Sequence, residues 1–368
     1  MRIGVPREVK DGERRVGVTP EGARQLVADG HAVLVEAGAG AAVGFGDGDY
    51  AQAGAQVVAT ADVWSCDLIV KVKELQPSEY ARLVRGTTVF GFAQINRDPA
   101  LLAAVLAAGI EAIAYETVRD AAGRLPLLAP MSRIAGRLAP LVGAQALSTN
   151  FGGAGVLLPG VDAVPGARVV VLGAGNVGGE AARIAARLGA RVTVFSRGTH
   201  RRDALARSLA AEGHAIAAFP LADARAARFV DAVTAADLVI GGVLEPGTLS
   251  PKLVTRAMVA AMRPGSALVD VGIDQGGIAE TSRMTKLSEP TYVECGVVHY
   301  AVPNMPSLVA RTATLALGEA TLPYVRALAG RGIARAQAED AGLAAGTMVR
   351  AGAIVHAGLA ADAAARAA

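Results

Sequence analysis

The chain has 368 residues, which is enough for two domains, because single hydrophobic cores stop growing at about 250–300 residues. Its net charge of +3 and its aromatic fraction of 4% do not favour a nucleic-acid-binding surface, which needs clustered cations and stacking rings. No apolar run approaches the roughly 18 residues of a membrane span and no signal peptide opens the chain, so we expect a cytoplasmic protein without a membrane partner.

Strand-like and helical patterns alternate over residues 1–130. Thr19-Pro20-Glu21 is typical of a helix start, with a hydroxyl cap, a proline in the first turn and an acid behind it. Other elements are expected as strands at Arg2–Pro6, His31–Glu36, Leu68–Val72, Thr87–Phe92 and Glu111–Tyr115, and as helices at Ser78–Val84 and Ala100–Ala108. This alternation predicts a parallel, doubly wound sheet.

The stretch from Gly166 to Arg202 contains a glycine fingerprint between two predicted strands. An apolar run at Val169–Leu172 precedes the turn, a helical pattern follows it, and a second strand is expected at Val192–Phe195. The turn itself consists of Gly173, Ala174, Gly175, Asn176, Val177 and Gly178. In this context the glycines permit a tight turn, the approach of a pyrophosphate, and close packing of helix on strand. We therefore predict a dinucleotide-binding unit, with the pyrophosphate at the helix N-terminus.

The residues after the second strand indicate which dinucleotide binds. An NAD-selective site places an acid there to hold the ribose 2′-hydroxyl, whereas this chain has Ser196 and Arg197, followed by Arg201 and Arg202. A hydroxyl and guanidinium groups favour a 2′-phosphate. We therefore predict NADP as the cofactor. The alternative is that these arginines form a solvated surface patch and that NAD is also accepted.

The rest of the chain completes both predicted domains. Met131–Asn150 is expected to be a bridging helix, and Ser307–Leu322 a second long helix interrupted or kinked at Pro323. Further strands are expected at Ala217–Phe219, Leu238–Gly241, Ala267–Val271 and Tyr292–Cys295, and the alanine-rich tail from Gly330 is expected to be helical. We predict an α/β fold of two doubly wound, Rossmann-like domains joined by long bridging helices. The substrate domain comprises residues 1–130 plus 306–368, and the dinucleotide-binding domain residues 131–305.

Cysteine and histidine spacing predicts no metal site. Cys66 and Cys295 are far apart and match no Cys-x-x-Cys pattern, so we interpret them as free thiols. The histidines show no zinc motif.

Short motifs of a distinctive kind follow one another along the chain. They are the opening MRIGVPREVKDGERRVGVTP, Lys73-Glu74, Tyr115-Glu116-Thr117, LPLLAPMSRIAGR at Leu125–Arg137, VLEPG at Val243–Gly247, IDQGG at Ile273–Gly277, and Asn304-Met305-Pro306. In this set and order the chain resembles the alanine dehydrogenase family, which is related to the NAD(H)-binding subunit of proton-translocating transhydrogenase. The resemblance implies an active site in an interdomain cleft, reversible reductive amination of a 2-oxo acid, and homo-oligomers.

The resemblance also implies roles for individual residues. Arg15 matches the ligand of the substrate carboxylate and Lys73 the ligand of the carbonyl oxygen, while Asp274 matches the essential aspartate. A fork-shaped guanidinium suits a carboxylate, and an ammonium polarises a carbonyl. Further cofactor contacts are expected from Ser132, Val243, Leu244, Asn304 and Met305, with Asn304 also next to the substrate.

Two positions depart from the family pattern near the expected chemistry. Gln94 stands where the resemblance implies a catalytic histidine, and an amide cannot titrate. Arg133 stands where a glutamate is usual. We expect Gln94 to hydrogen-bond the substrate, and His299 is a candidate replacement base.

These departures favour an NADP-dependent reductase or dehydrogenase of an imino, 2-oxo or amino acid other than alanine, because reduction of a preformed imine needs one proton that Asp274 can supply. Two alternatives remain open. One is an authentic alanine dehydrogenase with an altered proton relay. The other is a transhydrogenase-like dinucleotide-binding subunit without a substrate of its own.

Overall fold

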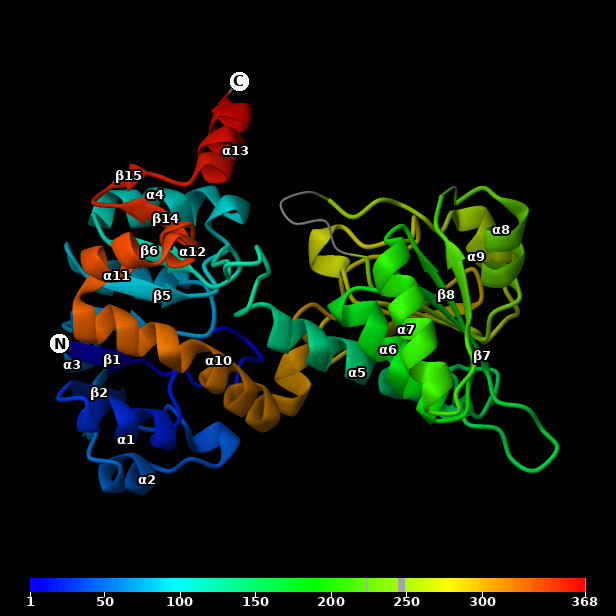
Figure 1. Cartoon of the computed structure of the whole chain (residues 1–368), viewed down its shortest axis with the longest axis horizontal. Coiled ribbons are helices and arrows are strands. Elements are labelled where there is room, and N and C mark those ends of the chain that lie inside the picture. The colour runs from blue at the N-terminus through cyan, green and yellow to red at the C-terminus, as the bar shows by residue number, and fades with distance from the viewer. Residues whose placement is uncertain (223, 244–248, 368) are drawn as a thin grey trace. The chain divides into compact units, whose positions relative to one another are not determined.

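The computed structural model describes residues 1–222, 224–243 and 249–367, which divide into two compact units. Unit 1 consists of Met1–Met131 and Ser307–Ala368, and unit 2 of Ser132–Pro306. Each unit is built on a mostly parallel sheet with helices packed against it (Figure 1). The predicted α/β class, with two Rossmann-like folds, is confirmed.

The sheet of unit 1 runs in the order β15-β14-β6-β5-β4-β1-β2-β3. Its strands are β1 (Arg2–Val5), β2 (Ala32–Glu36), β3 (Gln56–Val58), β4 (Leu68–Val70), β5 (Thr88–Gly91), β6 (Glu111–Ala114), β14 (Thr347–Arg350) and β15 (Ala353–Ile354). Strands β1 to β6 are parallel, whereas β14 is antiparallel to β6 and to β15. The carboxyl ends of β4, β5 and β6 therefore meet at one edge of the sheet, where ligands bind in open α/β folds.

Helices of unit 1 come from both ends of the chain. They are α1 (Pro20–Ala28), α2 (Asp47–Gln52), α3 (Thr60–Trp64), α4 (Pro99–Ala108), α10 (Ala310–Arg331), α11 (Ile333–Glu339), α12 (Ala341–Ala344) and α13 (Ala357–Ala367). The predicted cap of α1 is present, because the Thr19 Oγ1 accepts a hydrogen bond of 3.1 Å from the backbone N–H of Gly22.

The sheet of unit 2 runs in the order β12-β13-β11-β10-β7-β8-β9. Its strands are β7 (Arg168–Leu172), β8 (Arg191–Ser196), β9 (Ala217–Pro220), β10 (Leu238–Gly241), β11 (Ala267–Asp270), β12 (Thr291–Glu294) and β13 (Val297–Tyr300), of which β12 alone is antiparallel among the described strands of this sheet. Its helices are α6 (Asn176–Arg187), α7 (Thr199–Ala211), α8 (Ala227–Thr234), α9 (Arg256–Ala261) and most of α5 (Ala129–Ala146), which begins in unit 1.

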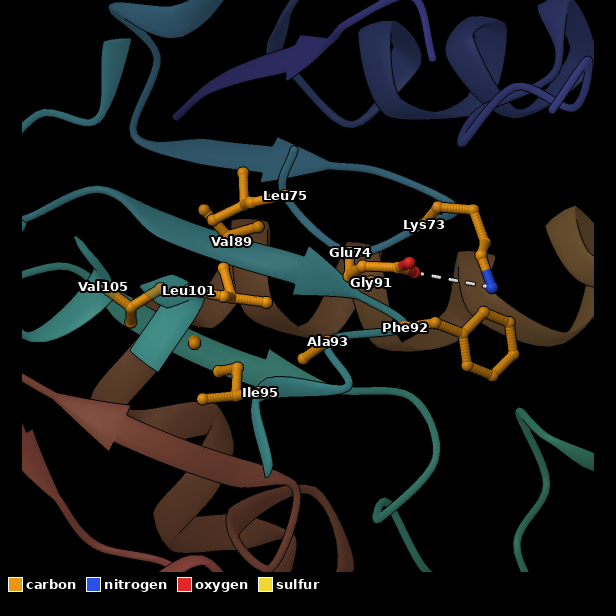
Figure 2. A pocket seen from close by; sticks show the side chains of 11 residues that line it. Lys73, Glu74, Leu75, Val89, Gly91, Phe92, Ala93, Ile95, Leu101 and Val105 are labelled. Carbon is orange, nitrogen blue, oxygen red and sulfur yellow. Dashed lines mark ion pairs between the residues drawn. The ribbon is translucent and has the colours of Figure 1, made fainter. Parts of the chain in front are cut away.

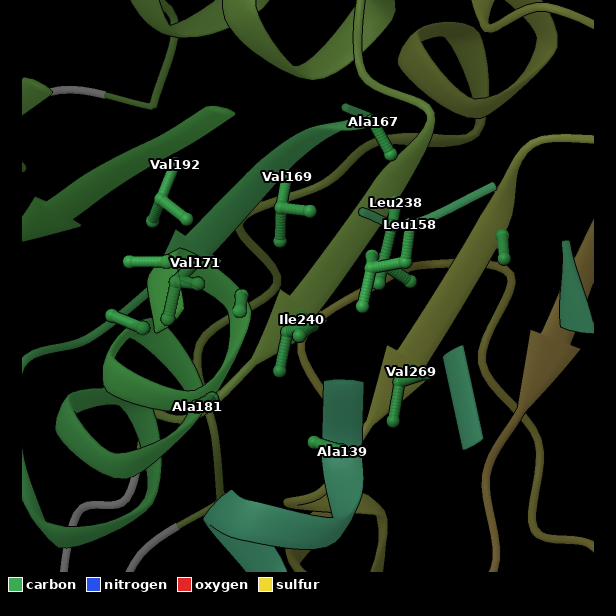
Figure 3. Packing of buried hydrophobic residues seen from close by; sticks show 14 of the residues in the cluster. Ala139, Leu158, Ala167, Val169, Val171, Ala181, Val192, Leu238, Ile240 and Val269 are labelled. Carbon is green, nitrogen blue, oxygen red and sulfur yellow. The ribbon is translucent and has the colours of Figure 1, made fainter. Parts of the chain in front are cut away.

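Alternate residues of the central strands in unit 2 belong to two different apolar clusters. Val169 and Val171 of β7 pack with Ala181 of α6 and Ala139 of α5 in one cluster (Figure 3). Val170 and Leu172 belong to the other cluster. A parallel strand buried on both faces reads as a continuous apolar run, which explains why β7 could be predicted from sequence.

The structure differs from the sequence predictions at four places. Ser78–Val84 was predicted as an α-helix, but Pro77–Arg82 forms a 3₁₀ segment in which Glu79 Oε2 accepts a 2.8 Å bond from the Gln76 N–H. The predicted interruption at Pro323 is absent, because α10 continues through it, whereas the kink predicted as its alternative stays a prediction. The tail contributes β14 and β15 rather than helix alone, and Val297–Tyr300 is an inner strand that was not predicted.

Candidate functional site

The turn between β7 and α6 has the backbone geometry that a phosphate cradle requires. Gly173 adopts φ +101°, and a Cβ on Gly178 would lie 2.0 Å from the Gly173 carbonyl oxygen, so neither position tolerates a side chain. A Cβ on Gly175, by contrast, would meet no atom within 4 Å. The residues present therefore fit a dinucleotide: the turn is closed on its protein side and open at Gly175, where the N-terminal N–H groups of α6 favour an anion.

A pocket of about 270 Å³ lies beside this turn in unit 2. Three arginines and one glutamate supply its charged side chains, and one histidine lies among them. The lining comprises Arg133, Ala174, Gly175, Asn176, Gly179, Glu180, Arg183, His200, Arg201, Ala204 and Leu205. The pocket thus joins the glycine turn to the first turn of α7, which follows β8.

The predicted basic cluster after β8 is divided by the structure. Ser196 is buried at the end of β8, and Arg197 behind it is exposed. Arg201 lines the pocket, whereas Arg202 does not: its Nε donates a 2.8 Å hydrogen bond to Asp203 Oδ1, and its side chain is 12% exposed. Of the two predicted arginines on α7, only Arg201 is placed to face a ligand at the glycine turn.

Asp274 lies in a short loop at the carboxyl end of β11, in the 3₁₀ segment Ile273–Gln275. It is half-buried. The loop is anchored by Asp270, whose Oδ2 accepts hydrogen bonds from the Ile278 N–H at 2.7 Å and the Ser282 hydroxyl at 2.6 Å. Burial raises the pKa of Asp270, although these two donors oppose the shift. Sequence reasoning missed Asp270, because it lies inside the apolar run predicted as the strand Ala267–Val271.

The remaining predicted cofactor contacts of unit 2 differ in burial and backbone conformation. Ser132 is half-buried on α5, and Asn304 has φ +63°. The side chain of Met305 is 2% exposed within the apolar core, so it packs there rather than presenting a side chain to a ligand. Val243 follows β10 and is buried. Leu244 lies outside the described residues.

His299 is unsuited to the role of a replacement base. It lies on β13 with no exposed surface, where its Nδ1 donates to the Val297 carbonyl at 2.9 Å and its Nε2 accepts from the Thr281 hydroxyl at 2.8 Å. Its ring stacks on Tyr292 with centroids 4.9 Å apart. Burial lowers its pKa, and both ring nitrogens are already engaged by the protein, so His299 is not available as a replacement base.

In unit 1, Lys73 follows β4 at the carboxyl edge of the sheet. Its side chain is 7% exposed, and its Nζ lies 3.5 Å from Glu74 Oε2. Burial lowers the pKa of Lys73, and the positive charges of Lys10 and Arg15 lower it further, while Glu74 opposes them. Such an amine can exchange a proton with a bound substrate more readily than an exposed lysine.

Arg15 is held by a carboxylate that sequence reasoning missed. Its Nε and Nη2 donate to the two oxygens of Glu13 at 2.7 and 2.5 Å, and its Nη1 lies 3.0 Å from Met131 Sδ. Both side chains of this ion pair are buried. The guanidinium is therefore fixed in orientation, and a substrate carboxylate would share it with Glu13. The spacing Glu13-x-Arg15 was the available signal.

Gln94 follows β5 and adopts φ +44°, which is uncommon outside glycine. Its backbone N–H donates to Glu116 Oε1 at 2.7 Å, and the Ala93 N–H lies 3.1 Å from the same oxygen. Burial raises the pKa of Glu116, although the two N–H donors and the charge of Lys73 oppose the shift. Glu116 thus holds the loop of Gln94 in place, a role that its position in a family motif did not reveal.

A buried network of charged side chains centres on Lys71, two residues before Lys73 in the chain. The ammonium of Lys71 contacts Glu79 Oε1 at 2.9 Å and Glu8 Oε2 at 3.1 Å, and Glu8 Oε1 accepts from the Val72 N–H at 2.6 Å. All three charged side chains are at most 4% exposed. The network therefore fixes the end of β4, and so the backbone that carries Lys73.

The cavity next to Lys73 is too small for a substrate. Aliphatic side chains such as Val89 and Leu101 fill one side of it, and Lys73 and Phe92 stand at the other (Figure 2). Its volume of about 20 Å³ suits no more than a water molecule.

The structure thus gathers Lys73, Gln94 and Glu116 at the ends of adjacent strands of unit 1, and Gly173, Val243 and Asp274 at the ends of adjacent strands of unit 2. In the part of the chain that is described, no group of three or more histidine, cysteine or acidic side chains could hold a metal ion. Nor does any helix in the described ranges combine the length and apolar character needed to cross a bilayer.

Comparisons with known proteins agree with this arrangement. Residues 4–135 match the family model "Alanine dehydrogenase/PNT, N-terminal domain" and residues 139–357 match "Alanine dehydrogenase/PNT, C-terminal domain". The alanine dehydrogenase of Halomonas elongata is 49% identical over 97% of this chain and 95% of its own length, and that of Mycolicibacterium smegmatis is 45% identical over 98% and 96%.

Two solved structures extend the likeness. An L-alanine dehydrogenase superposes with a TM-score of 0.94 at 44% identity, covering 99% of both chains. A transhydrogenase from Sinorhizobium meliloti superposes with a TM-score of 0.82 at 27% identity, covering 97% of this chain and 99% of its own. On this likeness over nearly its whole length, the chain belongs to the alanine dehydrogenase/PNT family of oxidoreductases.

Proposed function

We propose that the protein oxidises L-alanine with a nicotinamide dinucleotide and water, giving pyruvate, ammonium and the reduced dinucleotide, and that it catalyses the reverse reaction. The observation that carries this proposal is the likeness over nearly the full chain to relatives named alanine dehydrogenase. These relatives do not support the substrate other than alanine that Gln94 and Ser196 suggested. The cofactor would accept the hydride from the alanine Cα.

The residues of unit 1 would bind and orient the amino acid. Arg15, fixed by Glu13, would donate hydrogen bonds to the substrate carboxylate. Lys73, with its lowered pKa, would hold the carbonyl or carbinolamine oxygen and exchange a proton there. The side-chain amide of Gln94 would hydrogen-bond a polar substrate atom without changing its own charge.

Asp274 of unit 2 would supply the second titrating group. It would accept the proton of the attacking water and return a proton to the leaving ammonia. Gln94 cannot share this work, so proton transfer would depend on Asp274 and Lys73. The absence of a titrating group at Gln94 also favours a second candidate reaction, the reduction of a preformed imino acid, because that reaction needs only one proton.

For the cofactor we propose a preference for NADP over NAD. Ser196 at the end of β8 carries no charge to repel a 2′-phosphate, and Arg201 of the neighbouring pocket would attract it. In Ser196→Asp, a carboxylate would stand beside that phosphate, so the Kd for NADPH should rise about tenfold or more relative to that for NADH. An unchanged ratio of the two Kd values would contradict the preference.

Steady-state assays separate the candidate reactions. Pyruvate with ammonia, and in parallel a preformed cyclic imino acid, are reduced with NADPH and with NADH. The main proposal expects turnover of pyruvate and ammonia, faster with NADPH. Turnover of the imino acid alone would favour the second reaction. Binding of the dinucleotide without turnover of either substrate would favour a transhydrogenase-like subunit.

A further inference from the structure

The pocket between α6 and α7 holds more positive charge than its own acids neutralise. Arg133 comes from α5, Arg183 from α6 and Arg201 from α7. The acid among the described lining residues is Glu180, and its Oε2 already accepts a 2.6 Å hydrogen bond from Arg137 Nε. The walls therefore carry a net positive charge, which suits a compact, multiply charged anion.

Two of these arginines have no hydrogen-bond or ion-pair partner among the described residues. Within the described residues, no hydrogen bond or ion pair engages the guanidinium of Arg133 or of Arg201. Arg183, in contrast, donates from Nη1 to Ser208 Oγ at 2.9 Å and lies 3.9 Å from Glu212 Oε1. The guanidinium groups available to a ligand are thus those of Arg133 and Arg201.

The position of the pocket identifies the anion. Gly175 and Asn176 line it, and they belong to the turn that would hold the pyrophosphate. His200 and Arg201 come from the first turn of α7, just after β8 ends at Ser196, where the adenosine ribose of a dinucleotide lies in this fold. A phosphate on that ribose would project into the pocket, whose volume of about 270 Å³ is ample for it.

We propose that Arg133 and Arg201 form the binding site of the 2′-phosphate of NADP, with His200 as a further donor. The residues that bind the phosphate then come from α5 as well as from the segment after β8. Arg202 does not bind the phosphate, because it is paired with Asp203. This inference rests on the proposed function only in taking a nicotinamide dinucleotide as the ligand.

Isothermal titration of the full-length protein tests the site with two fragments that differ in one group. The fragments are 2′,5′-ADP, which carries the 2′-phosphate, and 5′-AMP, which lacks it. The variants are Arg133→Ala, Arg201→Ala and the double variant. The matched control is Arg187→Ala, because Arg187 is also exposed and on α6 but pairs with Glu212 and does not line the pocket.

Each single variant should raise the Kd of 2′,5′-ADP about tenfold and the double variant about a hundredfold, while the Kd of 5′-AMP changes less than about twofold. In the same variants, the Kd of NADPH should rise as that of 2′,5′-ADP does, and the Kd of NADH should change as little as that of 5′-AMP. Equal Kd values for 2′,5′-ADP in the double variant, Arg187→Ala and the unmodified protein would overturn the inference, as would an equal loss of both fragments.

Failure of the proposed function gives a different result. The titration needs no amino acid, so arginine-dependent binding of 2′,5′-ADP without any alanine turnover would refute the reaction and support the phosphate site. Alanine turnover with NADP that is equally fast in the unmodified protein and in the double variant, at limiting cofactor, would refute the phosphate site and support the reaction.

Discussion

At the scale of single residues, burial shifts the pKa of a lysine that is expected to move protons and the pKa of a carboxyl group that anchors the loop of Asp274. Lys73 is almost fully buried at the end of β4, and its pKa is lowered by that burial and by neighbouring cations. Asp270 is completely buried at the end of β11, and its pKa is raised by burial. The sequence predicted Lys73 from its motif. The spacing Glu13-x-Arg15 was a local signal for Glu13 that was missed, whereas Glu116 and Asp270 could not be predicted, because their importance comes from partners that folding brings to them.

Replacement of Lys73 should affect catalysis and leave cofactor binding intact. In Lys73→Met the aliphatic stem is retained and the amine is lost, so kcat for alanine oxidation should fall by about 10²-fold or more. The Kd of NADPH should stay within about twofold, because the glycine turn belongs to unit 2. The control is Lys286→Met, an exposed lysine. A kcat for Lys73→Met equal to that of the control would remove Lys73 from the mechanism.

Asp270 should make stability depend on pH with a definite sign. Its native pKa lies above the value of about 3.9 in the unfolded chain, so the native state holds the proton more tightly. Stability should therefore fall as pH rises from about 4 through the native pKa, and then level off. Asp270→Asn has no carboxyl group to titrate and should not lose this stability. The Tm of the variant minus the Tm of the unmodified protein should therefore increase as pH rises. A Tm difference that is constant or shrinks over this range would contradict the assignment.

At the scale of elements, two glycines of the turn from β7 into α6 should have different roles, one in folding and one in ligand binding. A Cβ at Gly178 would collide with the Gly173 carbonyl, whereas one at Gly175 has open space. Gly178→Ala should therefore lower the free energy of unfolding by about 1–3 kcal/mol. Gly175→Ala should keep the Tm of the unmodified protein and weaken NADPH binding about tenfold, because its methyl group would meet the pyrophosphate.

Thermal melts and NADPH titrations of these two glycine variants provide the measurement. Loss of stability in Gly175→Ala, or unchanged NADPH affinity in that variant with a normal Tm, would show that the open side of the turn does not face a ligand.

Elements with a strong local pattern were predictable and those defined by distant partners were not. The apolar run of β7, the glycine turn and the capped start of α1 carry their signals within a few residues. Strands β14 and β15 have no such signal, because they lie in an alanine-rich tail and join the sheet only through the pairing of β14 with β6, which is more than two hundred residues away in the chain. Pro323 does not interrupt α10, although a proline removes one backbone hydrogen bond from a helix interior.

At the scale of the whole molecule, the candidate residues are shared between two units. Arg15, Lys73 and Gln94 belong to unit 1, and the glycine turn and Asp274 belong to unit 2. The assignment of unit 1 to the substrate and unit 2 to the dinucleotide remains a prediction, as do the replacement of a family histidine by Gln94 and the formation of homo-oligomers. Each unit should bind its own ligand, and catalysis should need residues from both.

Asp274 tests this division of work from the side of unit 2. Asp274→Asn keeps the size and hydrogen-bonding capacity of the side chain but cannot take a proton, so kcat should fall by about 10²-fold or more, with the Kd of NADPH within about twofold. Full turnover in this variant would strip Asp274 of its role. A parallel loss of NADPH affinity would assign it to binding instead.

The central claim is hydride transfer from L-alanine, and isotope transfer tests it most directly. The protein is incubated with NADP⁺ and L-alanine deuterated at Cα, and the reduced dinucleotide is analysed by mass spectrometry. Our account predicts one deuterium on the reduced nicotinamide ring, accompanied by pyruvate, and almost none with Asp274→Asn. Absence of deuterium from the dinucleotide, under conditions in which the protein is saturated with NADP⁺ and alanine, would contradict it.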